Sequence, residues 1–182
     1  MFKSTQRVFA QLATALSHGM ANGLKTLDIR LQNGLSKPLS HRDSDCTFAL
    51  IEAFLKAHHG HMQELRLNNF FSRDMGLEIA RMILFESLPA LKVLELSGCA
   101  IGERGAAALS MVLVGVKTDL VELNLRDNCL TRRDVNQFGL ALGLFSGRAR
   151  SLEKVDLRGN FIDPSIVAAF QSVKNVKFLI EP

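Results

Sequence analysis

The chain has 182 residues, of which 47% are hydrophobic, and its formal net charge is +4 at neutral pH. This length can bury one sizeable core, and both halves carry the same small basic excess, so no block resembles a nucleic-acid-binding arm. The three cysteines lack C-x-x-C spacing, no N-x-[ST] acceptor occurs, and no apolar run is long enough to span a membrane. We therefore expect an intracellular protein of the cytoplasm with no membrane contact.

Residues 5–21 predict an amphipathic helix, because Val8, Leu12 and Leu16 fall on one helical face. Two interpretations of residues 1–23 stay open. Their sequence parallels a later segment that leads into a strand, which indicates the first helix of the fold. The absence of acidic residues from this segment instead resembles a mitochondrial targeting segment, and that interpretation would place the protein in mitochondria.

A second helix is expected over residues 44–60. Asp43, Ser44 and Asp45 supply oxygens that can cap the free amides at its start, and Gly60 is expected to end it. Its apolar face comprises Phe48, Ile51, Phe54 and Leu55.

A third helix is expected over residues 72–87. Ser72 or Asp74 can cap its start, and Pro89 follows shortly after its end. Short segments between the helices place apolar residues at alternate positions, as expected for strands.

One sequence pattern recurs along the chain. Residues 91–101 read L-x-x-L-x-L-x-x-C-x-I, and the same pattern begins again 29 positions later, with Asn128 in place of Cys99. This spacing is typical of leucine-rich repeats. The units begin at Leu24, Met62, Leu91, Leu120, Leu152 and Val176. The second unit is degenerate, because Phe70 stands where the pattern has Asn or Cys.

Residues 101–109, IGERGAAAL, resemble the start of the helix in the ribonuclease-inhibitor-like subfamily of leucine-rich repeat proteins. The resemblance is strongest over residues 91–162 and extends weakly over most of the chain. It implies an α/β leucine-rich-repeat solenoid of horseshoe shape, with parallel strands on the concave face and helices on the convex face. We expect a single such domain over residues 1–182, with about five to six repeats.

The ninth position of each unit is expected to have a structural role. An Asn there ends the strand, and its side chain can hydrogen-bond backbone amides of neighbouring turns. Cys99 is expected to act as a weak donor in the same role.

No catalytic or nucleotide-binding motif occurs: the sequence lacks G-x-G-x-x-G, a P-loop, H-E-x-x-H and G-x-S-x-G. We therefore expect neither an enzyme nor a cofactor, and we assign no catalytic residue. His58, His59 and His61 are a candidate metal cluster. We favour an interaction of the first two with the C-terminus of the preceding helix, so we predict no metal site.

Alternate residues of the strands should line the concave face. From these we select as partner-binding candidates Arg66, Glu95, Glu122, Asn124, Arg126, Asp156, Arg158, Phe178 and Ile180. Opposite charges on adjacent strands can pair at about 0.2–1 kcal/mol each, so a self-compensated, solvated face is the alternative. Arg126 and Arg158 favour a partner, because adjacent strands place these like charges side by side. Glu122, Asp127 and Asp156 can compensate them.

The chain has no Trp or Tyr, so the anchors of a binding surface must come from Phe or Arg. Phe70, Phe71 and Phe161 lie at or beside the strand-exit turns and are candidates, with core packing as the alternative for each. Residues 176–181 predict an uncapped edge strand. One interpretation is that another chain covers this strand, with Phe178 in the contact. The alternative is a short strand that ends the solenoid in solvent, with Lys174, Lys177 and Pro182 protecting its edge.

These features predict a non-catalytic protein–protein interaction or assembly module that binds a protein partner through its concave face, its loops or its C-terminal edge. Three alternatives remain. The chain could be a structural subunit of a large assembly, including a mitochondrial one. It could regulate a GTPase, because the Ran GTPase-activating proteins share this repeat type. It could bind RNA through Arg132, Arg133, Arg148 and Arg150, although the balanced charge of the chain disfavours nucleic acid.

Overall fold

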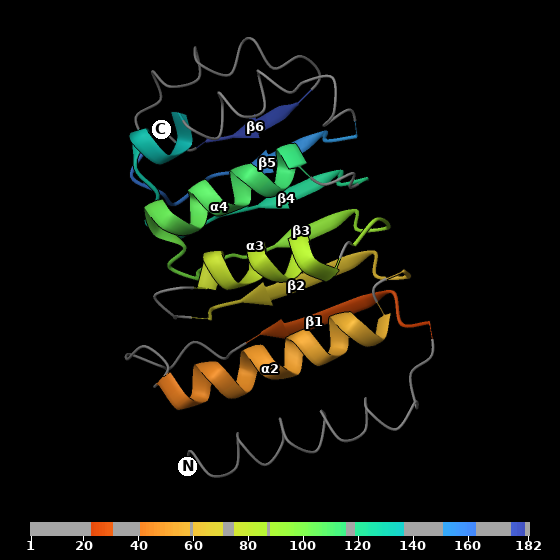
Figure 1. Ribbon diagram of the computed structural model, residues 1–182. Helices are drawn as coiled ribbons and strands as arrows, with labels where there is room; N and C mark the ends of the chain where they lie inside the picture. The colour runs from red at the N-terminus through yellow and green to blue at the C-terminus, as the bar shows by residue number, and fades with distance from the viewer. Residues whose placement is uncertain are drawn as a thin grey trace.

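The computed structural model describes residues 23–30, 41–58, 60–70, 75–86, 88–115, 119–136, 151–162 and 176–180. Six strands in these stretches form one sheet, and each strand pairs in parallel with the next strand along the chain (Figure 1). The strands are β1 (Thr26–Arg30), β2 (Glu64–Asn68), β3 (Val93–Glu95), β4 (Glu122–Asn124), β5 (Lys154–Asp156) and β6 (Lys177–Leu179). Stacked repeats that each contribute one strand produce this order.

The described helices lie on one and the same face of this sheet, as Figure 1 shows. They are α2 (His41–His58), α3 (Met75–Glu86) and α4 (Gly102–Gly115). We call the other face, which carries Glu64, Arg66 and Glu95 among others, the open face. Parallel sheets are ordinarily covered by helices on both faces, whereas no helix that the structure describes lies on the open face. None of the described helices is long and apolar enough to cross a membrane.

The covered face of the sheet is built from rows of apolar side chains. The register aligns the buried residues Leu27, Leu65, Leu94, Leu123 and Val155. A second buried row comprises Leu67, Leu96, Leu125 and Leu157. Helix residues, among them Ile51, Phe54, Ile79 and Leu109, belong to the same hydrophobic cluster. Each repeat therefore buries its apolar side by stacking on its neighbours.

The chain leaves four of the strands through a residue with left-handed backbone. The φ angle is 63° at Asn69, 66° at Gly98, 56° at Asp127 and 68° at Gly159. Gly accepts this conformation without steric cost, and Asn and Asp tolerate it better than other residues. The residue type at this position therefore favours the same tight turn in these four units.

The ninth position has its predicted structural role. The side chain of Asn128 accepts a hydrogen bond from the Cys99 N–H (2.9 Å) and donates to the Leu96 carbonyl (2.7 Å). Asn160 accepts in turn from the Asn128 N–H (2.9 Å). The thiol of Cys99 donates to the Leu67 carbonyl at 3.0 Å. These bonds satisfy backbone groups that water does not reach, so the predictions for Asn and for Cys99 are confirmed.

The predicted register of the last strand is wrong by one residue. Phe178 lies opposite Val155 of the buried row, and Leu179 lies opposite Asp156 on the open face. Phe178 and Ile180 are partly buried and pack against the core, so neither of these partner-binding candidates lies on the open face. Three consecutive apolar residues fit either alternation, and burial of the large Phe side chain favours the register observed.

The predicted start of α2 is also wrong. The helix begins at His41, so Asp43, Ser44 and Asp45 lie inside it and cannot be its N-cap. Acidic residues are favoured both at a cap and in the first turn, and these residue types therefore do not distinguish the two positions. The end at His58 agrees with the prediction of a helix that stops by Gly60.

Several predicted features lie outside the described residues. They are the helix over residues 5–21, the caps Ser72 and Asp74, the residues Phe71 and His59, and the basic residues Arg148 and Arg150.

Candidate functional site

As predicted, the residues of β1 to β5 that alternate with the buried rows share one face of the sheet, the open face, where they form three columns. The register aligns Thr26, Glu64, Val93, Glu122 and Lys154 in the first column. It aligns Asp28, Arg66, Glu95, Asn124 and Asp156 in the second. The third, at the strand exits, comprises Arg30, Asn68, Ser97, Arg126 and Arg158. All partner-binding candidates except Phe178 and Ile180 therefore share this face.

Arg66 is the centre of one polar network on the open face. Its guanidinium donates to Glu95 on the next strand at 2.8 Å and to Glu64 on its own strand at 3.1 and 3.2 Å. The other carboxylate oxygen of Glu95 accepts from the Asn68 side chain at 2.9 Å. Burial disfavours the charged guanidinium, but the hydrogen bonds to Glu64 and Glu95 outweigh it and raise the pKa of Arg66. The network fixes these long side chains in one arrangement.

A second network occupies β4 and β5. Lys154 donates to the Glu122 carboxylate at 2.6 Å, across the two strands. Arg158 donates to both oxygens of Asp156, at 2.6 Å from Nη2 and 3.0 Å from Nε. Burial of Asp156, which is 3% exposed, opposes its ionisation. The hydrogen bonds from Arg158 and the positive charges of Arg158 and Arg126 outweigh burial, and they lower the pKa of Asp156.

The like charges Arg126 and Arg158 are compensated locally. Arg126 donates to the Asp127 carboxylate at 3.0 Å, and its charge also acts on Asp156, the direct partner of Arg158. The predicted compensation by Asp127 and Asp156 is confirmed. The predicted compensation by Glu122 is wrong, because this carboxylate pairs with a lysine. The repulsion between Arg126 and Arg158 is therefore offset within the chain, and no partner protein is needed to neutralise these charges.

The last strand adds two side chains to the open face that the sequence analysis did not select. Lys177 lies beside Lys154, and Leu179 lies beside Asp156. The sequence could have predicted this orientation of β6, because burying a Lys side chain costs far more free energy than burying a Phe side chain. An exposed Lys177 fixes Phe178 in the inward row.

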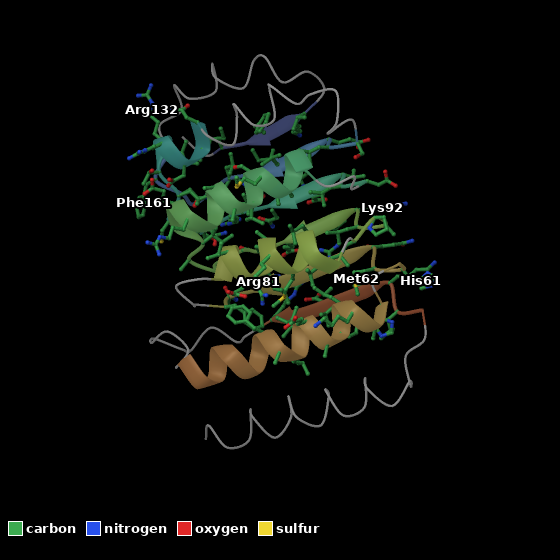
Figure 2. All side chains as sticks on the ribbon, in the orientation of Figure 1. His61, Met62, Arg81, Lys92, Arg132 and Phe161 are labelled. Atoms are coloured by element: carbon green, nitrogen blue, oxygen red, sulfur yellow. The ribbon has the colours of Figure 1, made fainter. Side chains whose placement is uncertain are left out.

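The two described candidate phenylalanines, Phe70 and Phe161, occupy adjacent positions of their repeats and differ in burial. Phe70 stands at the ninth position and is 1% exposed, so it belongs to the core. Phe161 follows the ninth-position Asn160, and its side chain is 73% exposed. Figure 2 shows Phe161 at the same edge of the sheet as Arg132, where the strands end. Of the two, only Phe161 can contact a partner.

Among the described residues, the histidines and Cys99 have structural surroundings. No group of three His, Cys, Asp or Glu side chains in this part of the chain could hold a metal ion. His58 is buried with its ring 4.7 Å from that of Phe54, whereas His61 is exposed. Burial raises the pKa of the Cys99 thiol to about 12, so this residue is a structural donor and not a nucleophile.

Residues 88–110 match the family model of the leucine-rich repeat. The matched segment contains β3, its exit turn and the first part of α4, which together form one strand-to-helix unit. With the six parallel strands in sequence order, this match supports a leucine-rich repeat protein with an α/β solenoid fold. A comparison with curated proteins found no match. Leucine-rich repeats are generally protein–protein interaction modules and not enzymes.

Proposed function

We propose that this chain is a non-catalytic protein-interaction or assembly module of the ribonuclease-inhibitor-like type. In this proposal the open face is the concave side of a horseshoe and binds a protein partner. The observation that carries the proposal is the one-sided sheet: α2, α3 and α4 cover one face, and the other presents charged side chains of both signs. A partner on the open face completes the covering that parallel sheets ordinarily have.

The ion pairs of the open face support this role, because they order its side chains before a partner arrives. Arg66 is held by two carboxylates, and Arg158 is held by both oxygens of Asp156. Ordering a long side chain on binding costs about 0.5–1.5 kcal/mol. Since folding already orders these side chains, a partner that matches their charges binds without that cost.

A substitution at Val93 tests the proposal. Val93 lies in the first column between Glu64 and Glu122, on the face opposite the buried leucine row, so an arginine there leaves the core unchanged and the protein should stay folded. The larger side chain should nevertheless obstruct a partner on the open face. We expect the Val93→Arg variant of the tagged full chain to lose the protein that copurifies with the wild type.

The matched control is Met111→Arg. Met111 is 71% exposed on α4, on the covered side of the sheet, so the variant adds the same side chain away from the open face. It should retain the partner. Equal retention by both variants, with unchanged thermal unfolding, would count against a partner on the open face.

A further inference from the structure

Phe161 and two arginines form an exposed patch where the strands end. We call Phe161, Arg132 and Arg133 the carboxyl-edge patch. Phe161 is 73% exposed, and the Arg133 side chain is 78% exposed. Arg132 is exposed too, and Figure 2 shows it pointing away from the ribbon at the same edge as Phe161.

Backbone contacts hold the parts of the patch together. The N–H of Phe161 donates to the Leu130 carbonyl at 2.8 Å, and Phe161 forms a parallel bridge with Thr131. The N–H and the hydroxyl of Thr131 both donate to the buried Asp134 carboxylate at 2.8 Å. These two bonds, together with the Val135 N–H that donates to the Thr131 carbonyl at 3.1 Å, fix the start of the helical turn at residues 132–136, which carries both arginines.

The arginines of the patch gain little from the described residues around them. They occupy the first turn of a helix, where the backbone dipoles favour negative charge and disfavour positive charge. Asp134, the nearest acid in sequence, is buried and already accepts two hydrogen bonds from Thr131. Glu103 lies 3.9 Å from Arg133, and both side chains are mostly exposed, so this pair is weak. Within the part of the chain that the structure describes, local stability therefore does not account for two positive charges close to an exposed phenyl ring.

We infer that the carboxyl-edge patch binds an acidic segment of a partner protein, with an apolar side chain of that segment against Phe161. Aromatic and arginine side chains are the types that contribute most to protein interfaces. The charge of the patch complements carboxylates, and its single ring offers one apolar contact. A nucleic-acid strand uses several stacked rings along a basic groove, and the patch has one ring. That the partner is a protein rests on the proposed function. The surface that binds it is separate from the open face.

Binding of a labelled peptide to the full chain tests the inference. The probe is a short fluorescent peptide with one Leu flanked on both sides by Glu, and the readout is fluorescence anisotropy. We expect Phe161→Ala to weaken binding about tenfold and the double variant Arg132→Gln with Arg133→Gln to weaken it at least as much. Met111→Ala is the control, because this side chain is 71% exposed and lies on α4. It should leave binding unchanged.

Each other outcome overturns the inference. The patch is not the site if the wild type does not bind the peptide, if a Lys-for-Glu peptide binds equally well, or if Met111→Ala weakens binding as much as Phe161→Ala. Binding of poly(U) that shows the same dependence on Phe161 and on the arginines would assign the patch to nucleic acid. Val93→Arg separates the two proposals. It should obstruct the open face and leave peptide binding intact, so either proposal can fail without the other.

Discussion

Gly76 of α3 and Gly105 of α4 bring two neighbouring helices into backbone contact. A Cβ atom on Gly76 would lie 2.7 Å from the Cα of Gly105, and one on Gly105 would lie 2.9 Å from the Cα of Gly76. Side-chain carbons do not approach backbone atoms that closely. Gly105 is the second glycine of the IGERGAAAL segment, so this part of the repeat pattern encodes the spacing between helices.

We expect Gly105→Ala to destabilise the protein. Alanine normally improves a helix interior by about 0.5–1 kcal/mol, but separating the two backbones should cost about 1–3 kcal/mol. The expected net loss in the free energy of unfolding is about 1–2 kcal/mol, measured by urea denaturation. Gly60→Ala is the control, because a Cβ there has no atom within 4 Å. A Gly105→Ala variant as stable as the wild type would refute the close contact.

Shortening the leucine side chains of the first buried row should destabilise the protein. Leu94 and Leu123 lie opposite each other in β3 and β4, and both are buried. We expect Leu94→Ala and Leu123→Ala each to lower the free energy of unfolding by about 2–5 kcal/mol. Equilibrium denaturation measures this loss. Losses below about 1 kcal/mol at both positions would be incompatible with the register of the sheet.

Asp156 should make stability depend on pH in acid. Its folded pKa is lower than its unfolded pKa, so its contribution is fully present above the unfolded value, roughly 4. That contribution is lost as the pH falls through the folded pKa. We expect Asp156→Asn to cost about 1–3 kcal/mol at neutral pH, because it removes charged hydrogen bonds to Arg158.

The difference between wild type and Asp156→Asn should shrink as the pH falls below about 4. Urea denaturation of both proteins over a pH series measures it. A difference that stays constant into strong acid would show that the ionised carboxylate has no special role. Arg30 also pairs with an Asp, but both side chains are more exposed, so breaking that pair should change stability by less than about 1 kcal/mol.

The cysteines should differ in reactivity. Cys129 is exposed, whereas Cys99 is buried and its thiol pKa is raised to about 12. In a Cys46→Ser background, we expect a disulfide reagent to modify Cys129 rapidly in the folded protein and Cys99 only after denaturant is added. Adding Cys129→Ser should abolish the rapid phase. Rapid modification of Cys99 in the native protein would contradict its burial.

The sequence was sufficient to predict the register of β1 to β5, because each unit repeats its leucines around polar neighbours and a slip by one residue would expose the whole row. The register of β6 was missed, because residues 178–180 are all apolar and fit either alternation, and the one polar neighbour that distinguishes them, Lys177, was not used. The start of α2 was missed for a similar reason, since Asp43 and Asp45 suit either a cap or a first turn.

The sequence predicted which residues share the open face, but it did not predict which of their charged side chains form ion pairs with each other. Alternation along each strand identified which residues share the open face. It could not determine that Arg158 and Arg126 would be held by different aspartates, because side-chain rotamers decide that choice. Phe161 could have been recognised as outward-facing from its place one residue after Asn160, since the equivalent Cys129 follows Asn128 and is exposed as well.

The order of the sheet has a consequence for how such a chain can change in length. Each strand that the structure describes is hydrogen-bonded only to the strands before and after it in the sequence, so no pairing among these strands joins distant units. A duplicated unit inserted between β4 and β5 would pair with a strand on each side, as the existing units do. It would disrupt no pairing between units that are not neighbours in sequence. The architecture can therefore lengthen by duplication of one unit at a time, and each added unit would extend the open face by one further strand.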